Sequence, residues 1–327
     1  MSIRSFLRLS AHIQMLPILE GGEETLVGGQ AVMEGVMMRA PHSYCVAVRR
    51  ANGELVTEEQ PLPRLSEKYP IFKLPILRGL GTLGHAMALG VKALKFSMNA
   101  SIADLAKTPD EKPVELPGWV LALNLIFSLA MFLFMYKFVP LFLATRIGTL
   151  LPAGHQRIEV NLIDGAIRLG LLVVFLLLVS RMKDMRRMFQ YHGAEHKVVF
   201  NYESGQPVTV ENAQKFVTFH PRCGTSFLIV VMLIAIPVYA FLPFDTFLAK
   251  FIARIALLPL ILGGSYELIR YAAKHQGGLM ALLTRPGLWL QRVTTQPPSD
   301  EQAAVAIHAL QGAMQLEKSQ GGELVIA

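Results

Sequence analysis

Thr225–Phe244 reads TSFLIVVMLIAIPVYAFLPF, a run of twenty residues without a charged side chain. An α-helix rises about 1.5 Å per residue, so a run of this length matches the roughly 30 Å hydrocarbon core of a bilayer. A helix that is apolar on every face is buried in protein or in lipid. The stretch therefore predicts an α-helical membrane protein.

The composition of the whole chain agrees with this prediction. Of its 327 residues, 52% are hydrophobic and 17% are charged, whereas about one quarter of a soluble domain is charged. The net charge of +7 is typical of contact with anionic lipid headgroups. No basic stripe is interleaved with aromatic residues, so no nucleic-acid partner is expected. Cys45 and Cys223 lie far apart, which argues against a disulfide framework and favours a reducing compartment.

Three further apolar segments accompany the opening run. They cover about Trp119–Ala144, Leu162–Arg181 and Phe247–Ile269. Lys137 lies near the end of the first, where its amine can snorkel to the interface, and charged residues make the last the weakest. We expect about four transmembrane helices within residues 117–270, with an error of one.

Lysine and arginine counts set the orientation of these helices. Only Arg146 and Arg157 lie between the segments Trp119–Ala144 and Leu162–Arg181. The loop 182–223, which leads from Leu162–Arg181 to the run Thr225–Phe244, is the richest in basic residues. We therefore expect this loop and both chain termini on the cytoplasmic side. The basic residues in and next to this loop are Arg181, Lys183, Arg186, Arg187, Lys197, Lys215 and Arg222.

The rest of the chain predicts smaller elements. Residues 1–24 form an N-terminal tail or surface helix, and residues 25–66 a small β-containing cap, because SYCVAVRR and ELVTEEQ are joined through Asn52-Gly53, a strong hairpin signal. Residues 67–116 are apolar but too basic for a clear span, so they predict an interfacial or re-entrant helix and a linker. Residues 271–327 form a C-terminal cytoplasmic helical segment, in which Ser299 is an N-cap.

The candidate site lies directly before the opening run, within Phe189–Ser226. It contains His192, Glu195 and His196 in the order H-x-x-E-H. Two histidines four residues apart share one face of a helix and can bind one metal ion. In the inverted zinc-peptidase arrangement the glutamate is the general base, and a zinc-bound water ionises near neutral pH. The motif predicts a divalent metal, zinc in particular, provided that the helix runs through Gly193.

The sequence leaves more than one candidate for the third metal ligand. A catalytic zinc needs three protein ligands, and His220, Glu203 and Cys223 are the nearby candidates. Cys223 is either a thiolate ligand or an inert thiol at the membrane boundary. Alternatively, these polar side chains only hydrogen-bond to the backbone or to lipid headgroups.

Two more distant carboxylates could reach the same site. Glu34 and Arg39 are the only charged residues in GGQAVMEGVMMRAP, Gly28–Pro41, which predicts either a tight turn with a surface ion pair or a segment that approaches the site closely. Glu267 lies near the end of the fourth apolar segment, where a carboxylate is costly. It either pairs with Arg270 at i+3 or faces the central loop.

Five separated motifs resemble the YqhQ-like family of bacterial membrane proteins. In chain order they are GGQAVMEGVMMR, YHGAEHKVVFNYESG, ENAQKF, FHPRCGTSFLIVV and VTTQPPSDEQAAVAIHAL, and they extend from about Val27 to about Leu310. The resemblance implies a multi-pass protein of the bacterial inner membrane and a predicted metal-dependent enzyme without a defined reaction. The candidate residues within the motifs are Glu34, Arg39, His192, Glu195, His196, His220, Arg222 and Cys223.

These patterns together predict a metal-dependent membrane enzyme, a hydrolase whose site faces the cytoplasm and acts on a membrane-embedded or membrane-adjacent substrate. His192 and His196 would bind the metal, with His220 or Glu203 as third ligand. One alternative is a non-catalytic scaffold or assembly factor. Another is a transporter with charged residues along a path, although no internal repeat of the kind many transporters carry is visible.

Overall fold

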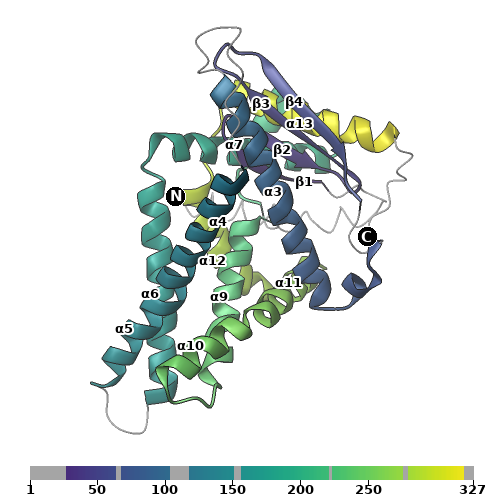
Figure 1. Cartoon of the computed structure of the whole chain (residues 1–327). Helices are drawn as coiled ribbons and strands as arrows, with labels where there is room; N and C mark the ends of the chain where they lie inside the picture. Colours follow the sequence, from purple (N-terminus) through teal and green to yellow (C-terminus); the bar gives the residue numbers. More distant parts are fainter. Residues whose placement is uncertain are drawn as a thin grey trace.

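The computed structural model describes residues 27–63, 68–103, 118–150, 156–220, 223–274 and 279–319. The predicted N-terminal tail, most of the linker and Arg222 lie outside these residues. A small sheet with helices on both faces occupies one end of the molecule, and long apolar helices extend away from it (Figure 1).

The sheet has four antiparallel strands in the order β1-β2-β3-β4. The predicted hairpin is confirmed: β3 (Ser43–Arg49) pairs with β4 (Leu55–Pro61), and Gly53 adopts a φ of 87° in the turn. A second hairpin joins β1 (Gly28–Val32) to β2 (Gly35–Arg39). Its two-residue turn contains Glu34 at a φ of 54°, so the glycine-rich stretch is mostly strand.

Helices cover both faces of this sheet. Helix α3 (Leu77–Ala103) packs on the face that carries Tyr44 and Val46, whereas α7 (Lys183–Glu203) and α13 (Asp300–Ser319) pack on the face that carries Cys45 and Ala47. Successive residues of a strand point to opposite faces. The run in β3 is therefore continuously apolar, as in strands that are buried on both sides.

Helix α3 lies within residues 67–116, where an interfacial or re-entrant helix and a linker were expected. A short 3-10 turn, η2 (Pro70–Lys73), precedes it. Its first half packs on α11, where Gly79 lies against Tyr266, and its second half packs on the sheet through Leu89 and Ala93. The helix therefore connects the sheet to the apolar helices.

Within the part of the chain that the structure describes, two helices are long and apolar enough to cross a membrane. The first covers Gly118–Gly148 and consists of α4 (Gly118–Leu133), the π-helical turn η3 (Phe134–Phe138) and α5 (Val139–Gly148). The second lies in α6 (Gln156–Val179). A third candidate is the pair α10 (Phe247–Ala256) and α11 (Leu258–Lys274), which is bent by 46°.

The uncharged run Thr225–Phe244 forms a shorter helix than expected. Helix α9 covers Gly224–Ala240, seventeen residues, or about 26 Å. It ends before Pro243, consistent with the bias of the residue preceding a proline against helical conformation. The described residues thus support a membrane protein with two to three candidate spans, and three lies within the error of one around the four expected.

The side chains of α4 agree with a lipid environment. None of its apolar stretch is buried, and Trp119, Leu123, Ile126 and Phe127 are each at least 60% exposed. A continuous exposed apolar surface of this kind needs a partner or a bilayer to cover it.

The remaining helices connect the two parts of the molecule. Helix α8 (Val210–Lys215) follows α7, and α12 (Leu279–Thr294) packs along α9 and leads to α13. Helix α7 begins at Lys183, and three residues, of which Met182 is extended, separate it from the end of α6 at Val179. It is therefore a separate helix at the junction between sheet and apolar helices.

Candidate metal centre

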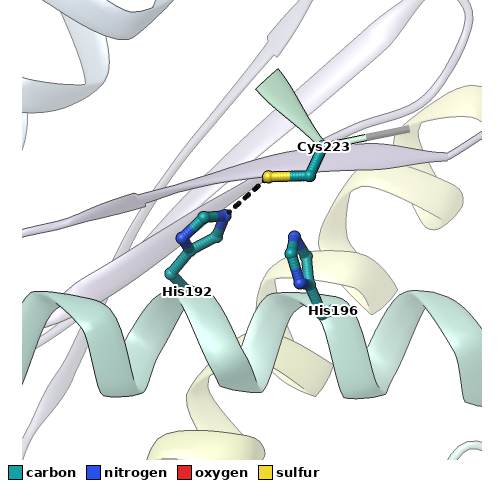
Figure 2. Close-up of side chains that lie close together, drawn as sticks. All are labelled: His192, His196 and Cys223. Atoms are coloured by element: carbon teal, nitrogen blue, oxygen red, sulfur yellow. Dashed lines mark hydrogen bonds between the residues drawn. The ribbon is translucent and has the colours of Figure 1, made fainter. Parts of the chain in front are cut away.

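The described structure brings His192, His196 and Cys223 together. Helix α7 runs through Gly193, as the motif requires, and presents both histidines on one face with their ring centroids 4.4 Å apart. Cys223 is the N-cap residue of α9, and its Sγ lies 3.3 Å from His192 Nε2 (Figure 2). One ligand atom from each of the three residues lies within 4.8 Å of the others.

Backbone carbonyl groups orient both imidazole rings. His192 Nδ1 lies 2.8 Å from the Thr294 carbonyl oxygen, and His196 Nδ1 is hydrogen-bonded to the Thr218 carbonyl oxygen. A carbonyl oxygen only accepts, so each Nδ1 carries the proton and each Nε2 keeps its lone pair. Metal-binding histidines are usually held in this way.

Burial also favours the neutral form of the second histidine. His196 is 2% exposed, and burial lowers its pKa below the ordinary value, although a hydrogen bond with Cys223 opposes this shift. The neutral ring that burial favours is the form that binds metal ions.

Gly193 allows the segment that contains Thr294 and Gln296 to pack closely against α7 beside His192. The segment after α12 crosses α7 here, and Gln296 N–H donates to the Phe189 carbonyl oxygen at 2.9 Å. A Cβ atom on residue 193 would lie 2.1 Å from the Gln296 carbonyl oxygen. Only glycine lets the segment that contains Thr294 come so close.

Gln291 of α12 holds the turn that supplies the cysteine. Its Oε1 accepts from His220 N–H at 2.7 Å, and its Nε2 donates to the His220 carbonyl oxygen at 2.8 Å and to Ser226 Oγ at 2.9 Å. The side chain is fully buried. It therefore fixes the chain on both sides of Cys223 against α12.

Lys197 holds the segment between α8 and this turn in place. Its buried amine donates to the carbonyl oxygens of Gln214 and Phe216, both at 2.7 Å. These carbonyl groups lie at the end of α8, two to four residues before Thr218. Lys197 thus fixes the segment whose carbonyl group orients His196.

Glu195 lies beside the ligand atoms. It is 6% exposed, and its Oε2 is 3.4 Å from His196 Nε2. Strand β1 makes room for it, because a Cβ atom on residue 29 would lie 2.6 Å from Glu195 Cγ. Gly29 therefore has a steric reason to be glycine, and the glycine-rich hairpin does approach the predicted site.

His220 and Glu203 form a pair of their own next to this group. His220 Nε2 lies 3.6 Å from Glu203 Oε2, and its ring centroid is 5.5 Å from that of His196. Burial lowers the pKa of His220 to about 4, against an opposing effect of the Glu195 carboxylate. The two residues expected to supply the third ligand thus lie beside the group that Cys223 completes.

The remaining candidates lie elsewhere in the described structure. Glu34 forms an ion pair with Arg187 of α7 and accepts a hydrogen bond from Tyr191 Oη at 3.4 Å. Glu267 forms an ion pair with Arg78 of α3. Arg39 ends β2, opposite Gly28 and Tyr44.

The spacing of the three ligand atoms fits a metal ion. In a tetrahedral zinc site, bonds of about 2.0–2.3 Å put two nitrogens about 3.4 Å apart and a nitrogen and a sulfur about 3.6 Å apart. The observed 3.3 Å and the 4.8 Å limit need only small side-chain movements. Imidazole and thiolate together favour zinc among the common divalent ions. The group could therefore hold a metal.

The residues that position the ligands had little signal in the sequence. Thr218 and Thr294 act through backbone carbonyl groups, which every residue carries. Gln291 and Lys197 make contacts that depend on neighbouring segments. The one available signal was that Thr294 lies in VTTQPPSDEQAAVAIHAL, one of the five motifs that carry the family resemblance, but no local pattern linked this motif to the histidines.

The described residues thus define a class: a membrane protein with two to three candidate spans and a His-His-Cys group that could hold a metal where the sheet-containing part meets the apolar helices. Residues 74–316 match a family described as "Protein of unknown function (DUF1385)", and the chain belongs to that family. It is 36% identical over 298 residues to "Uncharacterized protein YqhQ" of Bacillus subtilis (strain 168), covering 89% of this chain and 92% of that protein. This confirms the predicted resemblance. No solved structure matches the chain.

Proposed function

We propose that the protein is a metal-dependent membrane enzyme, a hydrolase in which His192, His196 and Cys223 bind one zinc ion. The observation that carries the proposal is the convergence of these three ligand atoms, with both Nδ1 atoms committed to carbonyl groups. Structural zinc sites use four protein ligands, whereas catalytic sites use three and leave a position for water or substrate.

The zinc ion would supply a bound water that ionises near neutral pH. Glu195 is suited to accept the proton of that water. Its carboxylate is buried 3.4 Å from a ligand nitrogen, and it does not belong to the ligand group itself. This is the role of the glutamate in the H-x-x-E-H arrangement.

The substrate would lie in or next to the membrane. Cys223 caps α9, so a ligand group begins where an apolar helix begins. His192 is only partly buried, which leaves the centre a side from which a substrate can approach. The basic residues of the loop before α9 favour a cytoplasmic location for this side.

Metal analysis of the purified full-length protein tests the proposal. We expect about one zinc ion per chain, and loss of this zinc in Cys223→Ser and in His192→Ala. His308→Ala is the matched control, because His308 is exposed on α13, away from the site. Gel filtration of each variant reports whether it is folded.

A second variant separates binding from catalysis. Glu195→Gln should keep the zinc and lose the function of the protein in complementation of a deletion strain. A folded wild-type protein without stoichiometric metal, together with full complementation by His192→Ala, would reject the enzyme and favour a scaffold.

A further inference from the structure

A second polar cluster lies among the apolar helices, outside the metal centre. Lys137 of η3, Arg168 of α6 and Arg254 of α10 gather around the ring of Tyr239, with cationic atoms 4.8–5.4 Å from its centroid. The three basic side chains are at most 8% exposed. Lys137 was expected to snorkel toward the interface, but its amine donates inward to Tyr239 Oη at 2.9 Å.

The cluster contains more positive than negative charge. Asp164 is the carboxylate that contacts it among the described residues: its oxygens lie 2.7 Å from Arg168 Nη2 and 2.9 Å from Arg254 Nη1. One carboxylate faces three basic groups, and Arg254 Nε is buried without a hydrogen-bond partner in the described part of the chain. Buried charges without compensation are costly, and intramembrane ionisable residues commonly mark binding sites.

The cluster lies far from the metal centre. Tyr239 is fifteen residues along α9 from Gly224, and Asp164 is fifteen residues before the end of α6 at Val179. Each separation corresponds to a rise of about 22 Å. The cluster therefore lies at the end of the apolar helices that is remote from the sheet, near the level of the membrane leaflet remote from the sheet.

An aromatic ridge connects the cluster to the lipid-facing surface. Phe138, next to Lys137, contacts Phe247 and Phe251 of α10 with centroids 5.4 and 6.1 Å apart. Phe247, Phe251 and Arg254 share one helical face, since they are spaced at i, i+4 and i+7. Phe134, 50% exposed, stacks on Phe138. Apolar surface beside buried cations suits a lipid, with its acyl chains on the ridge and its phosphate at the cations.

We propose that Lys137, Arg168 and Arg254 form a binding site for the phosphate of an anionic phospholipid in the leaflet remote from the sheet. Lys137 lies within a π-helical turn, a feature that often occurs at functional sites. A phosphate would supply the missing negative charge and accept hydrogen bonds from Lys137 and Arg254 Nε.

The test measures lipid selectivity of the purified full-length protein in mixed micelles. The probes are phosphatidylglycerol, phosphatidylcholine and inorganic phosphate, and the readouts are bound lipid in native mass spectrometry and the thermal midpoint. We expect the wild type to bind phosphatidylglycerol selectively. Lys137→Met should weaken that binding about tenfold, the value of one charge-assisted hydrogen bond.

Two variants control this comparison. Arg146→Gln removes an exposed basic residue of α5 outside the cluster and should bind like the wild type, whereas Lys137→Arg keeps the charge and should keep the selectivity. If Lys137→Met does not elute as a folded species in gel filtration, Lys137→Gln replaces it. Equal binding of both lipids, wild-type affinity in the charge-removing variant, or displacement of the lipid by millimolar inorganic phosphate would each overturn the proposal.

Discussion

Replacing Gly193 by alanine should disable the proposed metal centre without changing any of its three proposed ligands. Gly193 lies in the middle of α7, between the turns that carry His192 and His196. Alanine favours a helix over glycine by about 1 kcal/mol. Judged by helix propensity alone, the substitution would stabilise the protein.

Its surroundings reverse this expectation. The new Cβ would meet the Gln296 carbonyl oxygen at 2.1 Å, while ordinary contacts begin at 3.4 Å, so the segment must retreat by about 1.3 Å. The hydrogen bond of 2.8 Å between His192 Nδ1 and the Thr294 carbonyl oxygen would then break. Loss of such an orienting contact typically weakens metal binding 10–100-fold, and overpacking costs about 1–3 kcal/mol.

The assay is competitive zinc titration against a chromogenic chelator, with a thermal melt of the same samples. Gly84→Ala is the matched control, because Gly84 is also helical and nothing lies within 4 Å of its added Cβ. We expect the control to bind zinc normally and to melt at or above the wild-type temperature. If Gly193→Ala binds zinc as tightly as the wild type, the role assigned to the Thr294 carbonyl group is wrong.

Three further results are expected. Gln291→Leu should lower the free energy of unfolding by about 2–4 kcal/mol, measured by denaturant titration, because the buried N–H and C=O groups of His220 lose their partner; an unchanged midpoint would contradict this. In metal-stripped protein, the pKa of His220 is about 4 in the folded state and about 6.5 in the unfolded state. The unfolded state therefore binds more protons between these values, and the free energy of unfolding falls as the pH drops from 6.5 toward 4. Melts across this range that show no such loss would refute the assignment. Burial raises the pKa of Cys45 to about 12, so iodoacetamide at pH 8 should leave its thiol unmodified in the folded protein and label it after denaturation, as judged by peptide mass spectrometry.

Much of the fold was accessible from local patterns. The apolar runs indicated a membrane protein because solvation by lipid depends on composition and length. Asn52-Gly53 indicated the hairpin of β3 and β4 because turn geometry is a local property. The number of spans was less accessible, since it depends on where helices end and bend: α9 stops at Ala240, and α10 meets α11 at 46°.

The second hairpin shows where local patterns failed. GGQAV has little strand propensity and was interpreted as a turn or close-approach segment. In the structure it pairs with β2 because the sheet, α3 and α7 together bury its neighbours. Tertiary packing overrides weak propensity in strands.

The sequence by itself determined the residue types of the candidate ligands and the placement of two of them, the histidines, on one helix face. His192 and His196 share a face because any helix places residues i and i+4 together. Only the tertiary structure decided that Cys223, rather than His220 or Glu203, completes the group, and that Thr218 and Thr294 orient the rings. The reason is that these contacts join α7 to chain segments up to 102 residues away, and such distances are fixed by packing, which no local pattern encodes.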